Sequence, residues 1–257
     1  RPVGGDEEVV KIEPGMSASD IGALLEDRGL IRSRGFFRIV AGFHGYDRDF
    51  RAGSQPVDPS RPTLEIARLL TENPPIPSDI SITVIEGLNI AGTAVSVAAQ
   101  TDVDSLSFAR TASDTNYARR LGIDKGTFEG YLYPDTYFVR PEADAERIIA
   151  RMAARFHEVF DDPLRARADK IGMTVHEVVT LASIIELETV RDTERPIVSQ
   201  VFHRRLELGR PLEANPTVQY ALGEKRRVLN EDLDIESPYN TYLHAGLPPG
   251  PIASPGE

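Results

Sequence analysis

The stretch Leu181-Ala-Ser-Ile-Ile-Glu-Leu-Glu-Thr189 lies within a strongly apolar segment, residues 175–190. At the start of this segment, Thr174 and Glu177 occupy the two positions of a capping box, in which each side chain accepts a hydrogen bond from the other residue's backbone N–H. We therefore expect a helix to begin at Val175. Because the segment is apolar on nearly every side, we expect that helix to be buried.

Two glutamates, Glu186 and Glu188, fall on apolar faces of this helix. A carboxylate on such a face is costly unless it is paired or protonated, and burial raises the pKa of a carboxyl group toward the range that a general acid needs. The alternative is an ion pair with an arginine such as Arg191 or Arg195, and periodicity alone favours that alternative. Residues two apart point to opposite sides of a helix, so the two glutamates cannot act as a facing pair.

The first part of the chain predicts a small module of strands and helices. Alternating apolar residues and caps predict strands over 8–12 and 80–85, helices over 20–28, 33–40 and 63–70, the last capped by Thr63, and a loop over 45–62.

The second part predicts a mainly helical domain. Helices are expected over 91–99, 105–112, 144–160 and 195–208, with a loop and short strand over 128–139. From Pro211 onward the chain is rich in proline and glycine turns, which predicts a loop-rich, partly stranded end. Together the two parts predict an α+β protein.

Composition narrows the classes of function. The chain has 257 residues, which suits two domains, and it has no cysteine, which excludes disulfides, thiol nucleophiles and cysteine metal sites. Its net charge of −11 disfavours a nucleic-acid partner, since phosphate binding needs a basic face. No run approaches the roughly 18–20 apolar residues of a membrane span.

Three polar and aromatic clusters are candidate binding elements. They are Glu129-Gly-Tyr-Leu-Tyr-Pro-Asp-Thr-Tyr137, Asn215-Pro-Thr-Val-Gln-Tyr220 and Ser237-Pro-Tyr-Asn-Thr-Tyr242. Carbohydrate sites combine such residues, because aromatic rings stack on sugar faces while amides bond hydroxyl groups. Composition slightly favours ordinary turn chemistry for the segments 215–220 and 237–242, and the first cluster fits the edge of a core equally well.

Other kinds of chemistry have no matching pattern. The five histidines lack the spacing of a metal site, Ser183 lacks the surroundings of a nucleophilic serine, and no glycine-rich phosphate loop is present. We therefore expect neither a metal nor an organic cofactor.

Six segments resemble the YceG-like (MltG) family of endolytic murein transglycosylases in residues, order and spacing. They are the stretch 181–189, the segments 129–137 and 215–220, Tyr239-Asn-Thr-Tyr242, Val201-Phe-His-Arg-Arg-Leu206 and the proline-rich segment 246–256. The segment 10–30, with its Pro14-Gly15 turn, resembles the LysM-like region of these proteins.

The resemblance implies a domain plan and an activity. Residues 1–86 would form a LysM-like N-terminal α/β module and residues 87–257 the YceG-like catalytic domain, which stops before the family's short C-terminal tail. The family cleaves the β-1,4 bond between N-acetylmuramic acid (MurNAc) and N-acetylglucosamine (GlcNAc) and leaves a 1,6-anhydro-MurNAc end. Two alternatives remain open, a catalytically silent peptidoglycan-binding scaffold and a lysozyme-like hydrolase of the same bond.

The resemblance also implies site residues. Glu186, the first glutamate of the signature, is the expected acid/base, because a single carboxylate suffices when the nucleophile is the sugar's own C6 hydroxyl. From the polar and aromatic residues of these segments we infer a set of sugar-binding residues: Glu129, Tyr133, Asn215, Thr217, Tyr220, Tyr239, Asn240 and Tyr242. Family members usually have an acidic residue where this chain has Asn215, whose amide can donate and accept hydrogen bonds but carries no charge.

Partners and location follow from the family as well. Peptidoglycan glycan strands are the expected partner, together with glycan-polymerising cell-wall enzymes. The expected location is the cell envelope, at the extracytoplasmic face of the plasma membrane, through a single-pass anchor upstream of this chain.

Overall fold

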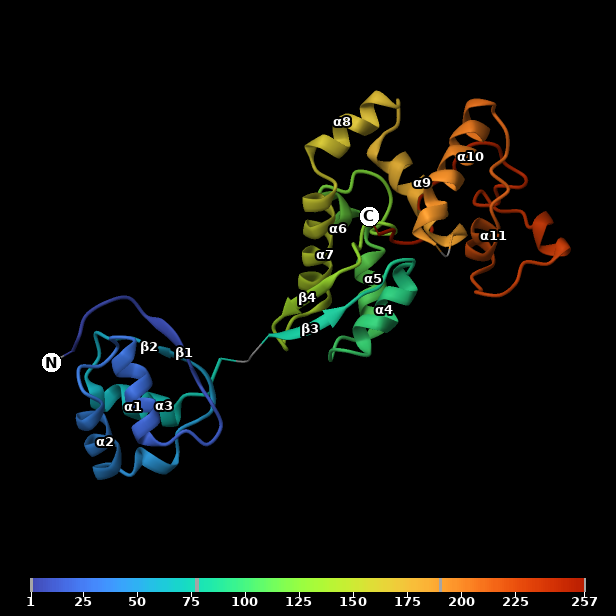
Figure 1. Ribbon diagram of the computed structural model, residues 1–257. Helices are drawn as coiled ribbons and strands as arrows, with labels where there is room; N and C mark the ends of the chain where they lie inside the picture. Colours follow the sequence, from blue (N-terminus) through green and yellow to red (C-terminus); the bar gives the residue numbers. More distant parts are fainter. Residues whose placement is uncertain (1, 77–78, 190, 257) are drawn as a thin grey trace. The chain divides into compact units, whose positions relative to one another are not determined.

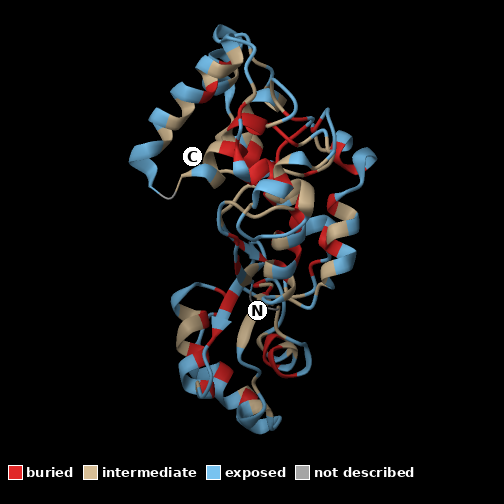
Figure 2. Ribbon diagram, turned by 90° about the vertical axis from the view of Figure 1, so that its right-hand side faces the viewer, coloured by how far each residue is buried: buried red, intermediate tan, exposed pale blue. Residues whose placement is uncertain are grey.

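The computed structural model describes residues 2–76, 79–189 and 191–256. It divides into two compact units, Arg1–Asp79 and Ile80–Glu257 (Figure 1). Each unit has buried residues of its own beneath an exposed outer surface (Figure 2). None of the helices in the described part of the chain is long and apolar enough to cross a membrane.

Unit 1 is a two-stranded antiparallel sheet with three helices. Its elements in chain order are β1 (Glu8–Ile12), α1 (Ala18–Asp27), α2 (Arg34–Phe43), the 3₁₀ turn η1 (Tyr46–Arg48), β2 (Gly53–Val57) and α3 (Thr63–Glu72). Val10 and Phe37, both fully buried, belong to the core that these elements share. Ser17 and Ser33 cap α1 and α2 through their side chains. Both predicted helices are therefore present, although α1 begins at Ala18, two residues before its predicted start.

The structure corrects two details of this unit. β2 lies inside the segment predicted as a loop, where Gln55 pairs with Val10 of β1. Gly53 and Pro56 weaken the strand signal, and only the distant β1 supplies the pairing. Pro62, rather than Thr63, stands at the cap of α3, with no side-chain hydrogen bond.

The first half of unit 2 packs helices around a second antiparallel pair of strands. The pair is β3 (Ile80–Thr83) with β4 (Thr136–Val139), and the helices are α4 (Ile90–Ala98), α5 (Ser105–Ala112), α6 (Thr115–Arg120), α7 (Ala145–Val159) and α8 (Asp162–Lys170). Phe108, Phe128 and Met152 are fully buried in their shared core. α7 shows the predicted amphipathic pattern and is capped by Asp144.

α9 (Val175–Glu188) joins this core to a second one in the same unit. Its capping box is formed as predicted, with Glu177 accepting from the Thr174 N–H. Val179 packs in the first core, whereas Leu181 and Ile184 pack in the second. The remaining elements are η2 (Asp192–Glu194), α10 (Arg195–Glu207), α11 (Asn215–Leu222) and η3 (Asn230–Asp234).

The C-terminal part differs from the expected loops. Asn215-Pro216 was predicted to form a turn, but Pro216 occupies the first turn of α11, where a missing N–H costs nothing. The expected strands are reduced to two isolated bridges in this region, Leu88 with Ser254 and Pro211 with Ala245.

Candidate active site

Glu186 lies in the last full turn of α9 with both carboxylate oxygens bonded. Oε1 accepts a hydrogen bond from Arg195 Nη2 at 2.9 Å, and Oε2 accepts one from the backbone N–H of Gly256 at 3.1 Å. The Glu186 side chain is 8% exposed, against 26% for Arg195. The ion pair anticipated as the alternative is therefore present, and the neighbouring Glu188 is exposed.

The C-terminal segment 249–256 lies along α9 and reaches Glu186. Three contacts attach it: the Nε2 of His176 lies 2.9 Å from the carbonyl oxygen of Pro249, Ser183 Oγ accepts from the Ile252 N–H at 3.0 Å, and the Gly256 N–H bonds Glu186. Ser183 is fully buried, so its hydroxyl anchors this segment. The proline-rich end of the chain thus builds one wall around the carboxylate.

A hollow of about 720 Å³ is lined by Leu187, the chain neighbour of Glu186, and by Gly87, whereas Glu186 itself does not line it. Leu187, Gly87 and Ile252 line one part of it, and Tyr220 with Gln219 of α11 lines another. Gly87 has φ 75°, and a Cβ built there would lie 4.0 Å from Glu186 Cγ and 3.3 Å from Leu187. The left-handed φ favours glycine at this position, and a side chain there would crowd Leu187 rather than Glu186.

Glu129 is a second carboxylate in this region. Its Oε1 accepts from the Ile90 N–H at 3.0 Å and its Oε2 from the Tyr220 hydroxyl at 3.2 Å. Burial raises the pKa of Glu129 to about 7, although both hydrogen bonds oppose that shift. Tyr220 in turn packs on Tyr239, with ring centroids 4.8 Å apart. Three of the predicted binding residues are therefore in direct contact with one another.

Asn215 and Tyr242 form a further pair. The Tyr242 hydroxyl donates to Asn215 Oδ1 at 2.8 Å, and Asn215 is exposed. Burial and then the charge of Glu188 raise the pKa of Tyr242.

Thr217 and Asn240 are fully buried. The Thr217 hydroxyl donates to the Ala214 carbonyl at 2.7 Å, and the Asn240 amide donates to the carbonyls of Leu233 and Ile235. These two side chains therefore stabilise the fold around the site. Tyr133 is half-buried, with the Arg155 guanidinium 5.9 Å from its ring centroid.

Arg205 was not singled out from the sequence, yet it shapes the approach to α11. Its Nη1 donates to the carbonyls of Pro211 and Leu212 and pairs with Glu213 at 2.6 Å. Glu213 has φ 52°, a left-handed conformation that is strained for a side chain other than glycine. Arg205 is the second arginine of Val201-Phe-His-Arg-Arg-Leu206, one of the segments that resemble the family. That resemblance was the feature of the sequence that could have identified it.

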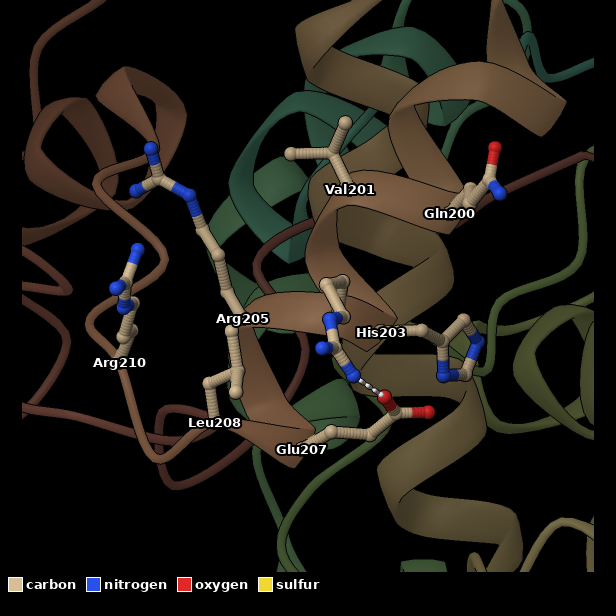
Figure 3. Close-up of a pocket in the computed structure, with 8 residues that line it drawn as sticks. Gln200, Val201, His203, Arg205, Glu207, Leu208 and Arg210 are labelled. Carbon is tan, nitrogen blue, oxygen red and sulfur yellow. Dashed lines mark hydrogen bonds and ion pairs between the residues drawn. The ribbon is translucent and has the colours of Figure 1, made fainter.

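A separate hollow of about 740 Å³ runs along α10 (Figure 3). Val201, His203 and Leu208 line it, as do Arg204 and Glu207, which pair at 2.9 Å on adjacent turns of α10. None of the predicted site residues lines it, so we do not assign the chemistry there.

Metal chemistry has no matching cluster in the described ranges. Across residues 2–76, 79–189 and 191–256, no group of three or more histidine, aspartate and glutamate side chains is placed to hold a metal ion.

A largely buried carboxyl group whose neighbours Gly87 and Leu187 line a hollow with tyrosine and amide side chains is compatible with a ligand site that has an acidic residue close by. The chain belongs to the YceG-like family, which matches residues 10–257.

Sequence and structure comparisons find similar proteins with related names. The chain is 32% identical over 263 residues to an endolytic murein transglycosylase of Bacillus subtilis (strain 168), covering 96% of this chain and 72% of the relative. It is 29% identical over 276 residues to an endolytic murein transglycosylase of Streptococcus pneumoniae serotype 2, of which it spans half the length. It is also similar to the crystal structure of a YceG-like protein from Listeria monocytogenes, with a TM-score of 0.65 and 30% identity over 97% of this chain and 87% of that one.

Proposed function

We propose that this chain is a peptidoglycan lytic transglycosylase that cuts the MurNAc-β-1,4-GlcNAc bond within glycan strands and leaves a 1,6-anhydro-MurNAc end. The observation that carries the proposal is the position of Glu186. Its side chain is largely buried, and Leu187 and Gly87 next to it line the hollow that Tyr220 also lines. It stands in a chain whose relatives are named endolytic murein transglycosylases.

The proposed reaction uses one carboxyl group twice. Protonated Glu186 donates its proton to the bridging oxygen as the bond from that oxygen to C1 of MurNAc breaks. The positive charge that develops at C1 is supported by the substrate's N-acetyl group or by nearby dipoles. The C6 hydroxyl oxygen of the same MurNAc then bonds C1, and ionised Glu186 takes the hydroxyl proton. The nucleophile is already attached to the reacting sugar, so no water has to be positioned.

The contacts of Glu186 suggest which oxygen moves the proton. Arg195 holds Oε1 at 2.9 Å, so we assign the proton transfer to Oε2, whose partner is the single N–H of Gly256. Arg195 then acts as a positioning residue that fixes the orientation of the carboxyl group.

Sugar binding is proposed for the accessible members of the predicted set. Tyr220 lines the hollow and is braced by Glu129 and Tyr239, and the exposed Asn215 is oriented by Tyr242. We propose that the buried Thr217 and Asn240 hold the sugar-binding residues Asn215 and Tyr220 in place. Tyr133 keeps its predicted role as a sugar-binding residue.

The remaining parts of the proposal concern the setting of the enzyme. We propose that unit 1 is a LysM-like module and that the protein works in the cell envelope, at the extracytoplasmic face of the membrane, beside enzymes that polymerise glycan. The murein named for the relatives supports the cell envelope as the location.

Mass spectrometry of digested peptidoglycan tests the reaction class. Anhydro-muropeptides, each one water lighter than a hydrolysis product, are the expected result. Release of glycan fragments longer than one disaccharide would indicate cuts inside the strands. Reducing-end products instead would make the protein a hydrolase, as for a lysozyme. No product of either kind would favour a binding scaffold.

A further inference from the structure

The hollow beside Glu186 has a basic end that the proposed reaction does not use. Lys225, Arg226 and Arg227 line it, directly after α11, while Leu187 and Gly87 line the part next to Glu186. All three basic residues are exposed. Glu224 also lines the hollow, so three cations and one carboxylate lie together there in a chain whose net charge is −11.

The segment that carries these residues is held in place. The left-handed Gly223, with φ 73°, ends α11, and Gln219 donates to the Arg226 carbonyl at 2.6 Å. The Arg226 guanidinium bonds both oxygens of the buried Asp232, at 2.6 and 2.7 Å. This bidentate pair holds the pKa of Asp232 at about 2, so it is present at all ordinary pH values.

Arg226 is already paired with acidic side chains, whereas among the described residues Lys225 and Arg227 are not. Arg226 also bonds Glu224 at 2.9 Å, so the nearest acidic side chains are already paired. For Lys225 and Arg227 the described part of the structure has no ion pair or side-chain hydrogen bond. Lys225 and Arg227 therefore line the hollow without acidic partners in the described ranges, on a segment that Arg226 holds in place.

We infer that Lys225 and Arg227 bind the carboxylates of the stem peptides that murein carries on its muramic acid. The inference rests on the proposed function, because it places the glycan in the same hollow. The sugars at the cleaved bond can be held by rings and amides, whereas the peptides carry free carboxylates, which are the complementary charge for lysine and arginine. The subsite favours strands with charged stem peptides.

Binding of soluble glycan fragments tests this subsite. Affinity is measured by fluorescence anisotropy with the full chain carrying Glu186→Gln, which is expected to prevent cutting. The fragments are peptide-bearing strands with free carboxylates, the same strands with those carboxylates converted to amides, and peptide-free strands. The double variant Lys225→Ala/Arg227→Ala is compared with Arg110→Ala/Arg151→Ala, which removes two exposed arginines of α5 and α7 that do not line the hollow.

The expected result is a loss confined to charged peptides. For strands with free carboxylates, the Lys225/Arg227 variant should bind about three- to tenfold more weakly, the effect of two exposed ion pairs, and should lose part of the salt dependence. Amidated strands should bind parent and variant alike, and the Arg110/Arg151 control should match the parent.

Three outcomes would overturn the inference. They are no change in affinity for free carboxylates, an equal loss for amidated strands, and a full loss for peptide-free strands, which would assign the charge to the lactyl carboxylate on the sugar. The proposed function fails separately, if the unsubstituted chain releases no product from any of these strands.

Discussion

Nη2 of Arg195, at the start of α10, lies 2.9 Å from Oε1 of Glu186, in the last turn of α9. The pair is mostly shielded from water, so its partners are costly to separate. Replacing Arg195 by Gln should lower kcat at least tenfold, with KM little changed, because the carboxyl group loses its fixed orientation. Unfolding free energy should fall by about 1–3 kcal/mol. Steady-state kinetics and thermal unfolding measure the two effects.

Two neighbouring changes serve as controls for this prediction. Asp192 also contacts Arg195, at 3.4 Å, but its side chain is 88% exposed, so Asp192→Asn should leave both kcat and stability nearly unchanged. Arg195→Lys keeps the charge and should restore part of the activity. Equal kcat for the parent and Arg195→Gln would contradict a positioning role.

Gly256 offers a test of the second contact on Glu186. Its N–H bonds Oε2, and a Cβ added at Gly256 would meet that oxygen at 3.8 Å and Glu86 at 3.7 Å, both ordinary contacts. Gly256→Ala keeps the N–H and should be tolerated, whereas Gly256→Pro removes it and should change the pH dependence of kcat. Identical pH profiles for the two variants would show that this contact does not matter to the reaction.

The capping box at Thr174 and Glu177 made α9 predictable from the sequence, because a local signal fixed where the helix begins. The Glu186–Arg195 pair was anticipated as an alternative, since arginines follow closely in the chain. The Gly256 contact could not be anticipated, because a backbone N–H seventy residues away leaves no trace in side-chain patterns.

α11 shows a different limit of sequence reasoning. Asn215-Pro216 fits a turn and the first turn of a helix equally well, and the buried contact of Thr217 with Thr241 comes from tertiary packing. The strand β2 was hidden for a similar reason, because its Gly and Pro are poor strand formers that pair only with the distant β1.

Glu129 should make stability depend on pH near neutrality. Its pKa is raised to about 7 by burial, above the value of an unfolded chain, so its contribution is complete below pH of about 4.5 and is lost as pH rises through 7. The unfolding free energy of the parent relative to Glu129→Gln should therefore fall between pH 5 and 8, by at most a few kcal/mol. Chemical denaturation across this range measures it, and a constant difference would contradict the buried, raised carboxyl group.

Asn215 and Thr217 should separate sugar binding from structural support. Asn215 is exposed, so Asn215→Ala should raise KM with stability within about 0.5 kcal/mol of the parent. Thr217 is fully buried, so Thr217→Val should cost about 1–2 kcal/mol of stability, because a buried acceptor at Ala214 loses its donor. Kinetics and thermal unfolding of both variants check this, and a stable Thr217→Val with raised KM would assign sugar contact to Thr217.

Glu186 and Glu188 provide the most direct test of the proposed reaction. They stand two residues apart on α9, but Glu186 is held by Arg195 and Gly256 next to the hollow, whereas Glu188 is exposed. The measurement is the rate of anhydro-muropeptide release from purified peptidoglycan by Glu186→Gln and Glu188→Gln. Loss of the general acid predicts a fall of about 10²–10⁴-fold for Glu186→Gln and a rate close to the parent's for Glu188→Gln. Anhydro products released at the parental rate by Glu186→Gln would contradict the account and move the acid to another residue.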